Sequence, residues 1–403
     1  MIGKLKAGTA TGLDFVATEL LKAVAAEENS PMLELLAVVF SQALKSGDLP
    51  VEWQTAVVKP VFKGGDQKAR GDWSNYRLIS LTSVVGKVFE AVLAERLNLA
   101  FEAAGLFAEE QFGFRKGRRC AHAQMLLSEI VKARARLGLN TYVSFLDVRK
   151  AYPTAYRAGI MAKLHAMLSK LPGGDCGRQT KIWRVIFKMY ERVMSFVRIS
   201  ADSGTADSEE YEVRHGLREG SSLSPTLYAV FINDLMSRLA DMEVEEILPG
   251  IDLRALMYAD DVAIVSANVT DRQRLLKRAG DHADDNQYQF SYKKSKHMVF
   301  GDDTRDVEVW LSAHDTGAAP VVMKRCDSYT YLGVEFHESL GAHARALEVF
   351  DFKRRYWGKK FLDEDVPDEG PRVFIRVRSR TGADGRDYFV GVSTPLAVLE
   401  VSK

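Results

Sequence analysis

Two adjacent aspartates, Asp260 and Asp261, are the side chains of this sequence whose types and spacing most clearly suggest chemistry. They lie between the apolar runs 254–257 and 262–265, which predict a β-hairpin with both carboxylates at its tip. Neighbouring carboxylates repel by about 1 kcal/mol in water and by about 4 kcal/mol when partly buried. A semi-buried pair therefore indicates a bound cation, for which Mg²⁺ is the natural candidate, or a shifted pKa. Taken alone, the pair is also typical of a plain polar turn.

Asp147 supplies a third carboxylate. Residues 141–148 have the pattern of a buried strand and residues 154–168 have helical spacing, so Asp147 is predicted at a strand-to-helix junction. A single aspartate at such a junction is also a common helix cap. With Asp260 and Asp261 it completes a set that could hold two metal ions about 3.5–4 Å apart, one activating an attacking oxygen and the other stabilising a leaving group.

Basic residues form the second group. Lys63 and Arg77 flank a turn containing Gly64 and Gly65, and the predicted hairpin could close its cations over a phosphate group. Taken alone, both residues are equally typical of ordinary surface cations. Cations also gather around Phe114, a composition suited to a nucleic-acid backbone and equally to a solvated loop or a nuclear-import signal. The segment 216–225 is rich in glycine and serine, which lets backbone approach a ligand closely or simply forms a turn and helix cap.

In their order along the chain, these segments resemble the reverse transcriptases, most closely those of non-LTR retrotransposons. The resemblance covers roughly residues 1–335 and is carried by segments 6–21, 49–53, 58–66, 76–81, 111–115, 145–152, 216–225, 258–261, 293–300 and 331–334. It implies an α+β fold, a right-hand polymerase whose palm is an antiparallel sheet backed by helices and whose thumb is incomplete or atypical. The expected domains are an N-terminal helical extension (1–50), fingers (51–140), palm (141–310), a primer-grip region with partial thumb (311–362) and a tail of unknown role (363–403).

The resemblance also implies an activity, namely an RNA-directed DNA polymerase that extends a primer 3′-hydroxyl with deoxynucleoside triphosphates (dNTPs) on an RNA template by a two-metal mechanism. Two Mg²⁺ ions, which Mn²⁺ can replace, are expected, with RNA template, DNA primer and dNTPs as partners. The implied catalytic residues are Asp147, Asp260 and Asp261, which with Val148 would also hold the metal. The implied nucleotide-binding residues are Lys63, Arg77, Tyr152, Glu219 and Gly220, and the implied nucleic-acid-binding residues are Arg115, Lys116, Arg118, Ser224, Pro225, Tyr331, Leu332 and Gly333. Glu219 departs from the family, where many relatives have glutamine.

The composition of the chain is compatible with this interpretation but would not by itself have indicated it. The chain has 403 residues, 46% of them hydrophobic, and a formal charge of +1, so nucleic-acid binding would depend on local patches. Three dispersed cysteines predict neither a disulfide framework nor a zinc cluster, and no apolar run approaches a membrane span. We expect an intracellular protein, nuclear if it belongs to a mobile element. Two alternatives stay open: an inactive nucleic-acid-binding relic, and a reverse transcriptase of the group II intron type. The sequence also leaves open whether the chain is part of a longer polyprotein.

Overall fold

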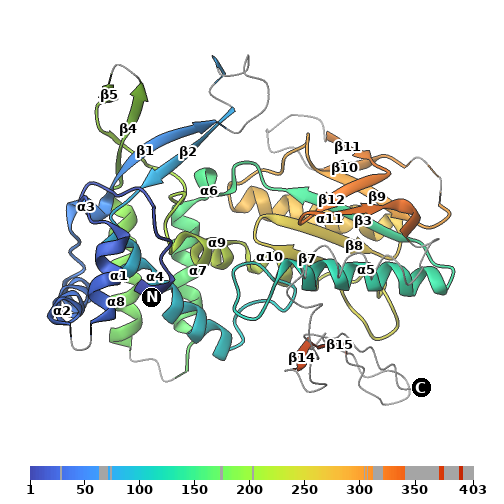
Figure 1. Ribbon diagram of the computed structural model, residues 1–403. Coiled ribbons are helices and arrows are strands. Elements are labelled where there is room, and N and C mark those ends of the chain that lie inside the picture. The colour runs from blue at the N-terminus through green and yellow to red at the C-terminus, as the bar shows by residue number, and fades with distance from the viewer. Residues whose placement is uncertain are drawn as a thin grey trace, which may run out of the picture. The chain divides into compact units, whose positions relative to one another are not determined.

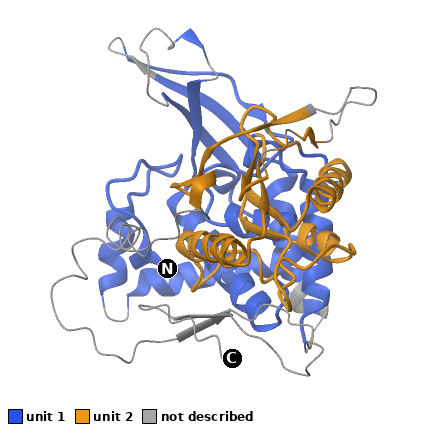
Figure 2. Ribbon diagram, turned by 90° about the vertical axis from the view of Figure 1, so that its right-hand side faces the viewer, with its two compact units in different colours: residues 1–107, 150–232, 286–288 blue, residues 108–149, 233–285, 289–403 orange. Residues whose placement is uncertain are grey.

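The polypeptide passes repeatedly between two compact units. The computed structural model describes residues 1–27, 30–62, 71–72, 75–172, 176–201, 204–303, 305, 307–311, 321–340, 372–375 and 390–393. Unit 1 contains residues 1–107, 150–232 and 286–288, and unit 2 contains residues 108–149, 233–285 and 289–403 (Figure 2).

Unit 1 is mainly helical. Its helices are η1 (Ile2–Lys4), α1 (Thr18–Ala26), α2 (Pro31–Ser46), α3 (Val51–Gln54), α4 (Val84–Ala103), α6 (Ala151–Thr154), α7 (Arg157–Ser169), α8 (Cys176–Glu191) and α9 (Ser224–Ile232). Local sequence sets their ends: α2 begins at a proline and ends at Gly47 in the left-handed region, and the Ser83 hydroxyl accepts a hydrogen bond from the Gly86 amide to cap α4. Phe40, Trp53 and Phe89 form an aromatic cluster in its core.

The sheet of unit 1 has the order β2-β1-β4-β5, with β6 also paired to β4 (Figure 1). Its strands are β1 (Thr55–Phe62), β2 (Tyr76–Leu81), β4 (Met194–Ala201), β5 (Gly204–Asp207) and β6 (Tyr211–Glu212). The predicted hairpin of residues 58–81 is confirmed, because β1 and β2 pair antiparallel with Val61 opposite Arg77. β4 also pairs antiparallel with β5 and with β6.

Unit 2 contains the sheet that carries Asp147 and Asp261. Its order is β10-β11-β9-β3-β8-β7, antiparallel except between β11 and β9. The strands are β3 (Thr141–Asp147), β7 (Ala255–Tyr258), β8 (Asp261–Ser266), β9 (Lys296–Phe300), β10 (Val309–Leu311) and β11 (Val321–Arg325). Residues 141–146 of β3 are all buried, as expected for a central strand covered on both faces.

Two helices of unit 2 cover opposite faces of this sheet (Figure 1). One face packs α5 (Cys120–Arg136) through Leu127 and Ile130 against Phe145. The other face packs α11 (Val269–Asp285), whose buried Arg272 lies over the Tyr142 ring and 3.3 Å from His297 Nδ1. Burial, followed by the nearby Arg272 charge, lowers the pKa of His297 to about 4. The remaining elements of unit 2 are α10 (Asp234–Ala240), β12 (Ser328–Tyr331), β13 (Val334–His337), η4 (Glu338–Leu340), β14 (Arg372–Ile375) and β15 (Val390–Ser393).

The two last strands, β14 and β15, pair antiparallel. Within the described residues, no helix combines the length and the apolar character needed to cross a membrane.

Candidate active site

The β7–β8 hairpin presents the aspartate pair as the sequence predicted. Tyr258 and Asp261 are partners across the two strands, which leaves Ala259 and Asp260 as the loop. Ala259 has φ 58°, a left-handed conformation that is unfavourable for a residue with a Cβ atom. The strain must therefore be held by surrounding contacts.

A segment of unit 2 far away in sequence holds this loop. The buried Gln111 side chain accepts hydrogen bonds from the amides of Ala259 (3.1 Å) and Gly113 (2.7 Å), and the Phe112 amide donates to the Met257 carbonyl (2.7 Å). A Cβ atom on Gly113 would lie 2.4 Å from the Ala259 nitrogen, so only glycine fits. The sequence shows this Gln-Phe-Gly segment only as part of the family resemblance and does not reveal its contact with Ala259, which lies 148 residues away in the chain.

Asp147 stands opposite Asp261 in the antiparallel register of β3 and β8, so both carboxylates project from the same face of the sheet. The turn after α11 fixes the backbone of Asp147: the Asp147 amide donates to Ser295 Oγ (3.2 Å), and the Ser291 amide donates to the Asp147 carbonyl (2.7 Å). Val148 is buried and bridges to Phe290 on the same segment.

Burial and mutual repulsion act on the carboxylates. Burial, followed by the charges of Asp260 and Asp147, raises the pKa of Asp261 to about 6. The pKa of Asp260 is also raised, chiefly by burial and further by Asp147. The neighbouring Tyr329 phenol has its pKa raised to about 12 by burial and by the charges of Asp261 and Asp147. The side chains thus concentrate negative charge where solvent screening is reduced.

The donor set fits a hard divalent cation, which prefers carboxylate oxygens. Asp147 Oδ2 is buried without a hydrogen-bond partner in the described part of the chain. Its other oxygen, Oδ1, lies 3.1 Å from the ammonium of Lys294. In this arrangement, no three His, Cys, Asp or Glu side chains among the described residues are already spaced to hold a metal ion. Metal binding would therefore require side-chain rotation around a fixed backbone.

The β12–β13 hairpin places the predicted residues Tyr331, Leu332 and Gly333 at its tip. Leu332 and Gly333 both have positive φ, and the Gln124 amide on α5 donates to the Leu332 carbonyl (2.8 Å). Tyr331 is buried, with its ring beside Phe145, on whose face Tyr329 stacks at 4.3 Å. The hairpin is thereby anchored to the strand that ends in Asp147.

The basic loop of unit 2 divides into buried and exposed cations. Arg115 is buried and donates to the carbonyls of Ala108 (2.6 Å) and Gln111 (3.0 Å), and Arg118 pairs with Glu109. Lys116 is exposed. Arg115 thus supports the loop that holds Ala259, and Lys116 is the residue of this group best placed to meet a ligand from solvent.

In unit 1, Tyr152 and the segment 216–225 lie together. Tyr152 stacks on Tyr228 at 5.5 Å, and its carbonyl accepts a hydrogen bond from the Leu217 amide (2.7 Å). A Cβ atom on Gly216 would lie 2.3 Å from the Pro153 carbonyl oxygen, which explains the glycine. Glu219 is half-buried and Gly220 is exposed with φ 100°.

The start of α9 is tied down by a buried carboxylate that sequence analysis missed. Glu90 accepts hydrogen bonds from the Ser221 hydroxyl (2.7 Å) and the Ser222 amide (2.9 Å), and the buried Ser224 hydroxyl donates to the Arg218 carbonyl (2.9 Å). Pro225 is the second residue of α9. A buried glutamate within the ordinary helical pattern of α4 gives no signal in the sequence alone.

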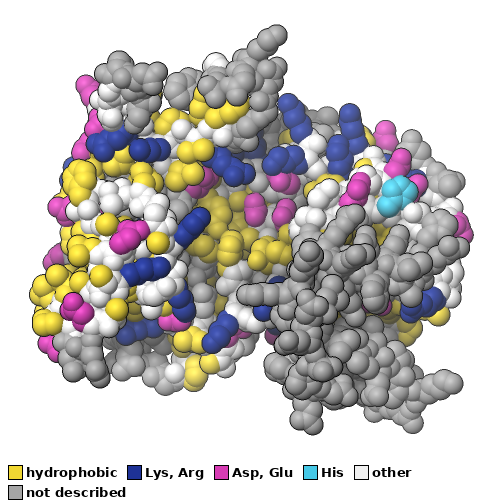
Figure 3. All heavy atoms as spheres, viewed as in Figure 1, with side chains coloured by type: hydrophobic (Ala, Val, Ile, Leu, Met, Phe, Trp, Pro, Cys, Tyr) yellow, Lys and Arg dark blue, Asp and Glu magenta, His cyan; other side chains and the backbone are white. Residues whose placement is uncertain are grey.

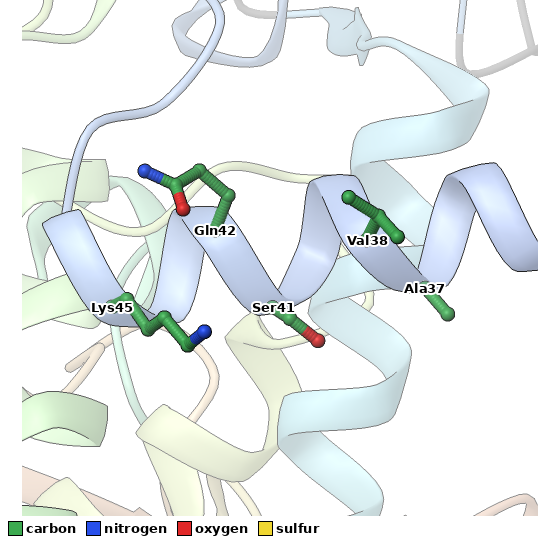
Figure 4. A pocket seen from close by; sticks show the side chains of 5 residues that line it. All are labelled: Ala37, Val38, Ser41, Gln42 and Lys45. Atoms are coloured by element: carbon green, nitrogen blue, oxygen red, sulfur yellow. The ribbon is translucent and has the colours of Figure 1, made fainter.

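Arg77 is exposed on β2, and Lys63 lies outside the described residues. On the face seen in Figure 3, Lys and Arg side chains are interspersed with Asp and Glu. A shallow hollow along α2 contains none of the predicted site residues; it is lined by Ala37, Val38, Ser41, Gln42 and Lys45 (Figure 4).

Comparison with known proteins gives the family to which the chain belongs. The reverse transcriptase (RNA-dependent DNA polymerase) family matches residues 65–336, more than half of the chain. The chain therefore belongs to the reverse transcriptase family, whose members are nucleotidyltransferases.

Similar proteins include several from non-LTR retrotransposons of Drosophila melanogaster. The chain is 28% identical over 286 residues to the probable RNA-directed DNA polymerase from transposon X-element, a match covering 70% of this chain and 28% of that protein. It is 23% identical over 357 residues to the RNA-directed DNA polymerase from mobile element jockey, covering 84% of this chain and 34% of that protein. A putative 115 kDa protein of the type-1 retrotransposable element R1DM is 30% identical over 265 residues, covering 66% of this chain and 22% of that protein. The chain thus spans no more than 34% of the length of these relatives.

Among solved structures, apo telomerase from Candida tropicalis is similar with a TM-score of 0.48 and 10% identity, covering 77% of this chain and 52% of that chain.

Proposed function

We propose that the chain is the polymerase core of a non-LTR retrotransposon protein, which extends a primer 3′-hydroxyl with dNTPs on an RNA template. The observation that carries the proposal is the pairing of Asp147 with Asp261 across β3 and β8, with Asp260 in the adjoining loop. Membership of the reverse transcriptase family supports the same reaction.

We assign the metal-binding role to Asp147, Asp260 and Asp261, with the Val148 carbonyl as a further ligand. Two Mg²⁺ ions, or Mn²⁺ in their place, would when bound activate the primer oxygen and neutralise charge on the leaving pyrophosphate. The protein's own contribution is to hold three carboxylates on a rigid backbone: the Gln111 side chain fixes the hairpin loop, and the Ser291–Ser295 turn fixes Asp147. Positioning and neutralisation of phosphate charge account for most of the catalysis in such transfers.

Unit 1 is assigned the nucleotide-binding residues Lys63, Arg77, Tyr152, Glu219 and Gly220. The stacking of Tyr152 on Tyr228 supports a rigid aromatic platform for the sugar of the nucleotide, where a 2′-hydroxyl would be sensed. In unit 2, the tip of the β12–β13 hairpin and the exposed Lys116 are assigned to nucleic acid. Residues 51–140 then serve as fingers, residues 141–310 as palm and residues 311–362 as primer grip with partial thumb. As a mobile-element protein, the chain would act in the nucleus.

The test is extension of a DNA primer on an RNA template by the purified chain with Mg²⁺, run in parallel with dNTPs and with ribonucleoside triphosphates. The proposal predicts extension with dNTPs, and Tyr152→Ala should raise the use of ribonucleotides relative to Tyr156→Ala, a nearby control. Binding of the primed template without extension by the folded protein would instead indicate a binding relic.

A further inference from the structure

Hydrogen bonds of the backbone hold the turn that contains Lys294 beside the carboxylates. The position of Lys294 is therefore set by the fold. The Lys294 and Ser295 amides both donate to the Ser291 carbonyl, at 3.2 and 2.8 Å, which closes a tight turn. The same turn is hydrogen-bonded to the Asp147 backbone through Ser291 and Ser295. Any movement of β3 therefore carries the Lys294 backbone with it.

The Lys294 side chain supplies a positive charge next to Asp147. Its ammonium lies 3.1 Å from Asp147 Oδ1, and its charge opposes the repulsion that Asp147 exerts on Asp260 and Asp261. Asp147 is 19% exposed, whereas the Lys294 side chain is 69% exposed. A flexible, solvent-exposed stem can swing its charge away without disturbing the core.

We propose that Lys294 is a positioning residue that acts as a stand-in cation: it neutralises Asp147 while no divalent ion is bound, and it must leave Asp147 Oδ1 when an ion enters. The inference rests on the proposed function, since it takes the three carboxylates as the metal site. Metal entry then exchanges one cation for another, so Lys294 sets how tightly the ion binds. It also keeps the metal-free carboxylates from repelling one another.

The test uses Mn²⁺ alone, with its free concentration read from its electron paramagnetic resonance signal, so no nucleotide or turnover is needed. Lys294→Met keeps the stem and removes the charge, Lys294→Arg keeps the charge, and Lys293→Met is the matched control on the adjacent exposed lysine. We expect Lys294→Met to bind Mn²⁺ about two- to fivefold more tightly than wild type, the range for a partly exposed ion pair. Lys294→Arg and Lys293→Met should stay near wild type.

A thermal melt supplies a second readout. Without metal, Lys294→Met should unfold at a lower temperature than Lys293→Met, and saturating Mn²⁺ should raise its melting temperature by more, because binding stabilises the folded state by mass action. Equal or weaker Mn²⁺ binding in Lys294→Met than in Lys293→Met would overturn the inference.

The proposed function fails in a different way. If Asp260→Asn binds Mn²⁺ as well as wild type, the carboxylates are not the metal site at all. If Asp260→Asn loses binding and Lys294→Met shows no gain over Lys293→Met, only the role of Lys294 is refuted.

Discussion

Asp147 and Asp261 are direct partners across the antiparallel strands β3 and β8, although more than a hundred residues separate them in the chain. Two like charges fixed opposite one another on one face of a sheet destabilise it unless something neutralises them. In the proposed function, this repulsion is the structural cost of a site that binds cations.

The paired carboxylates of Asp147 and Asp261 predict that the stability of the metal-free protein depends on pH. The pKa of Asp261 is raised to about 6 in the folded state, so between its ordinary value and pH 6 the folded state binds more protons than the unfolded state. Stability from this group is therefore present at low pH and lost as the pH rises through 6. In EDTA, Asp261→Asn should melt at a higher temperature than wild type at pH 7 and at nearly the same temperature at pH 4. A difference in melting temperature between Asp261→Asn and wild type that did not change with pH would contradict this prediction.

The buried His297 predicts that stability changes with pH in the opposite direction. Its folded pKa is lowered to about 4, so the unfolded state binds more protons between pH 4 and its ordinary value near 6.5. Stability from His297 is present above that ordinary value and is lost by about 2 to 3 kcal/mol as the pH falls to 4. Thermal unfolding of His297→Gln should be less sensitive to acid than that of wild type, whereas the exposed control His165→Gln should follow wild type.

Gly113→Ala should impair the site without touching a carboxylate. The added methyl group would lie 2.4 Å from the Ala259 nitrogen and push the loop that carries Asp260 out of place. We expect weaker Mn²⁺ binding and primer extension lowered by about 100-fold or more, since small misplacements are costly in catalysis. Gly3→Ala, where a methyl group meets nothing within 4 Å, is the control. Wild-type activity in Gly113→Ala would show that the loop tolerates displacement.

Arg115 and Lys116 should separate into different roles despite being adjacent. Lys116→Ala should weaken binding to primed template at all sequences and reduce the slope of log affinity against log salt by about 1, as for one lost phosphate contact. Arg115→Ala should instead destabilise the protein, because two carbonyls lose their donor. Fluorescence anisotropy at several salt concentrations, together with urea unfolding, distinguishes them. If Arg115→Ala weakened binding to primed template without lowering stability, Arg115 would be assigned to the nucleic-acid surface.

Sequence predicted the strands that carry the three carboxylates well, because their pattern is local. The strand of residues 141–148 and the aspartate hairpin follow from short apolar runs, and both are found as β3 and β7–β8. The break between α9 and α10 falls at Asn233, whose side chain accepts a hydrogen bond from the Ala108 amide. That bond joins residues 125 positions apart, which no local pattern reveals. The contacts of Gln111 and Glu90 were missed for the same reason.

The most direct test of the account is the rate of addition of a single deoxynucleotide to a primer on an RNA template, measured at saturating protein with Mg²⁺. Asp147→Asn, Asp260→Asn and Asp261→Asn are compared with Asp241→Asn, which makes the same change at an exposed site. The account predicts addition by wild type and by Asp241→Asn, with losses on the order of 100-fold or more in the other three. Equal rates in all five folded proteins would contradict the assignment of Asp147, Asp260 and Asp261 as the catalytic carboxylates.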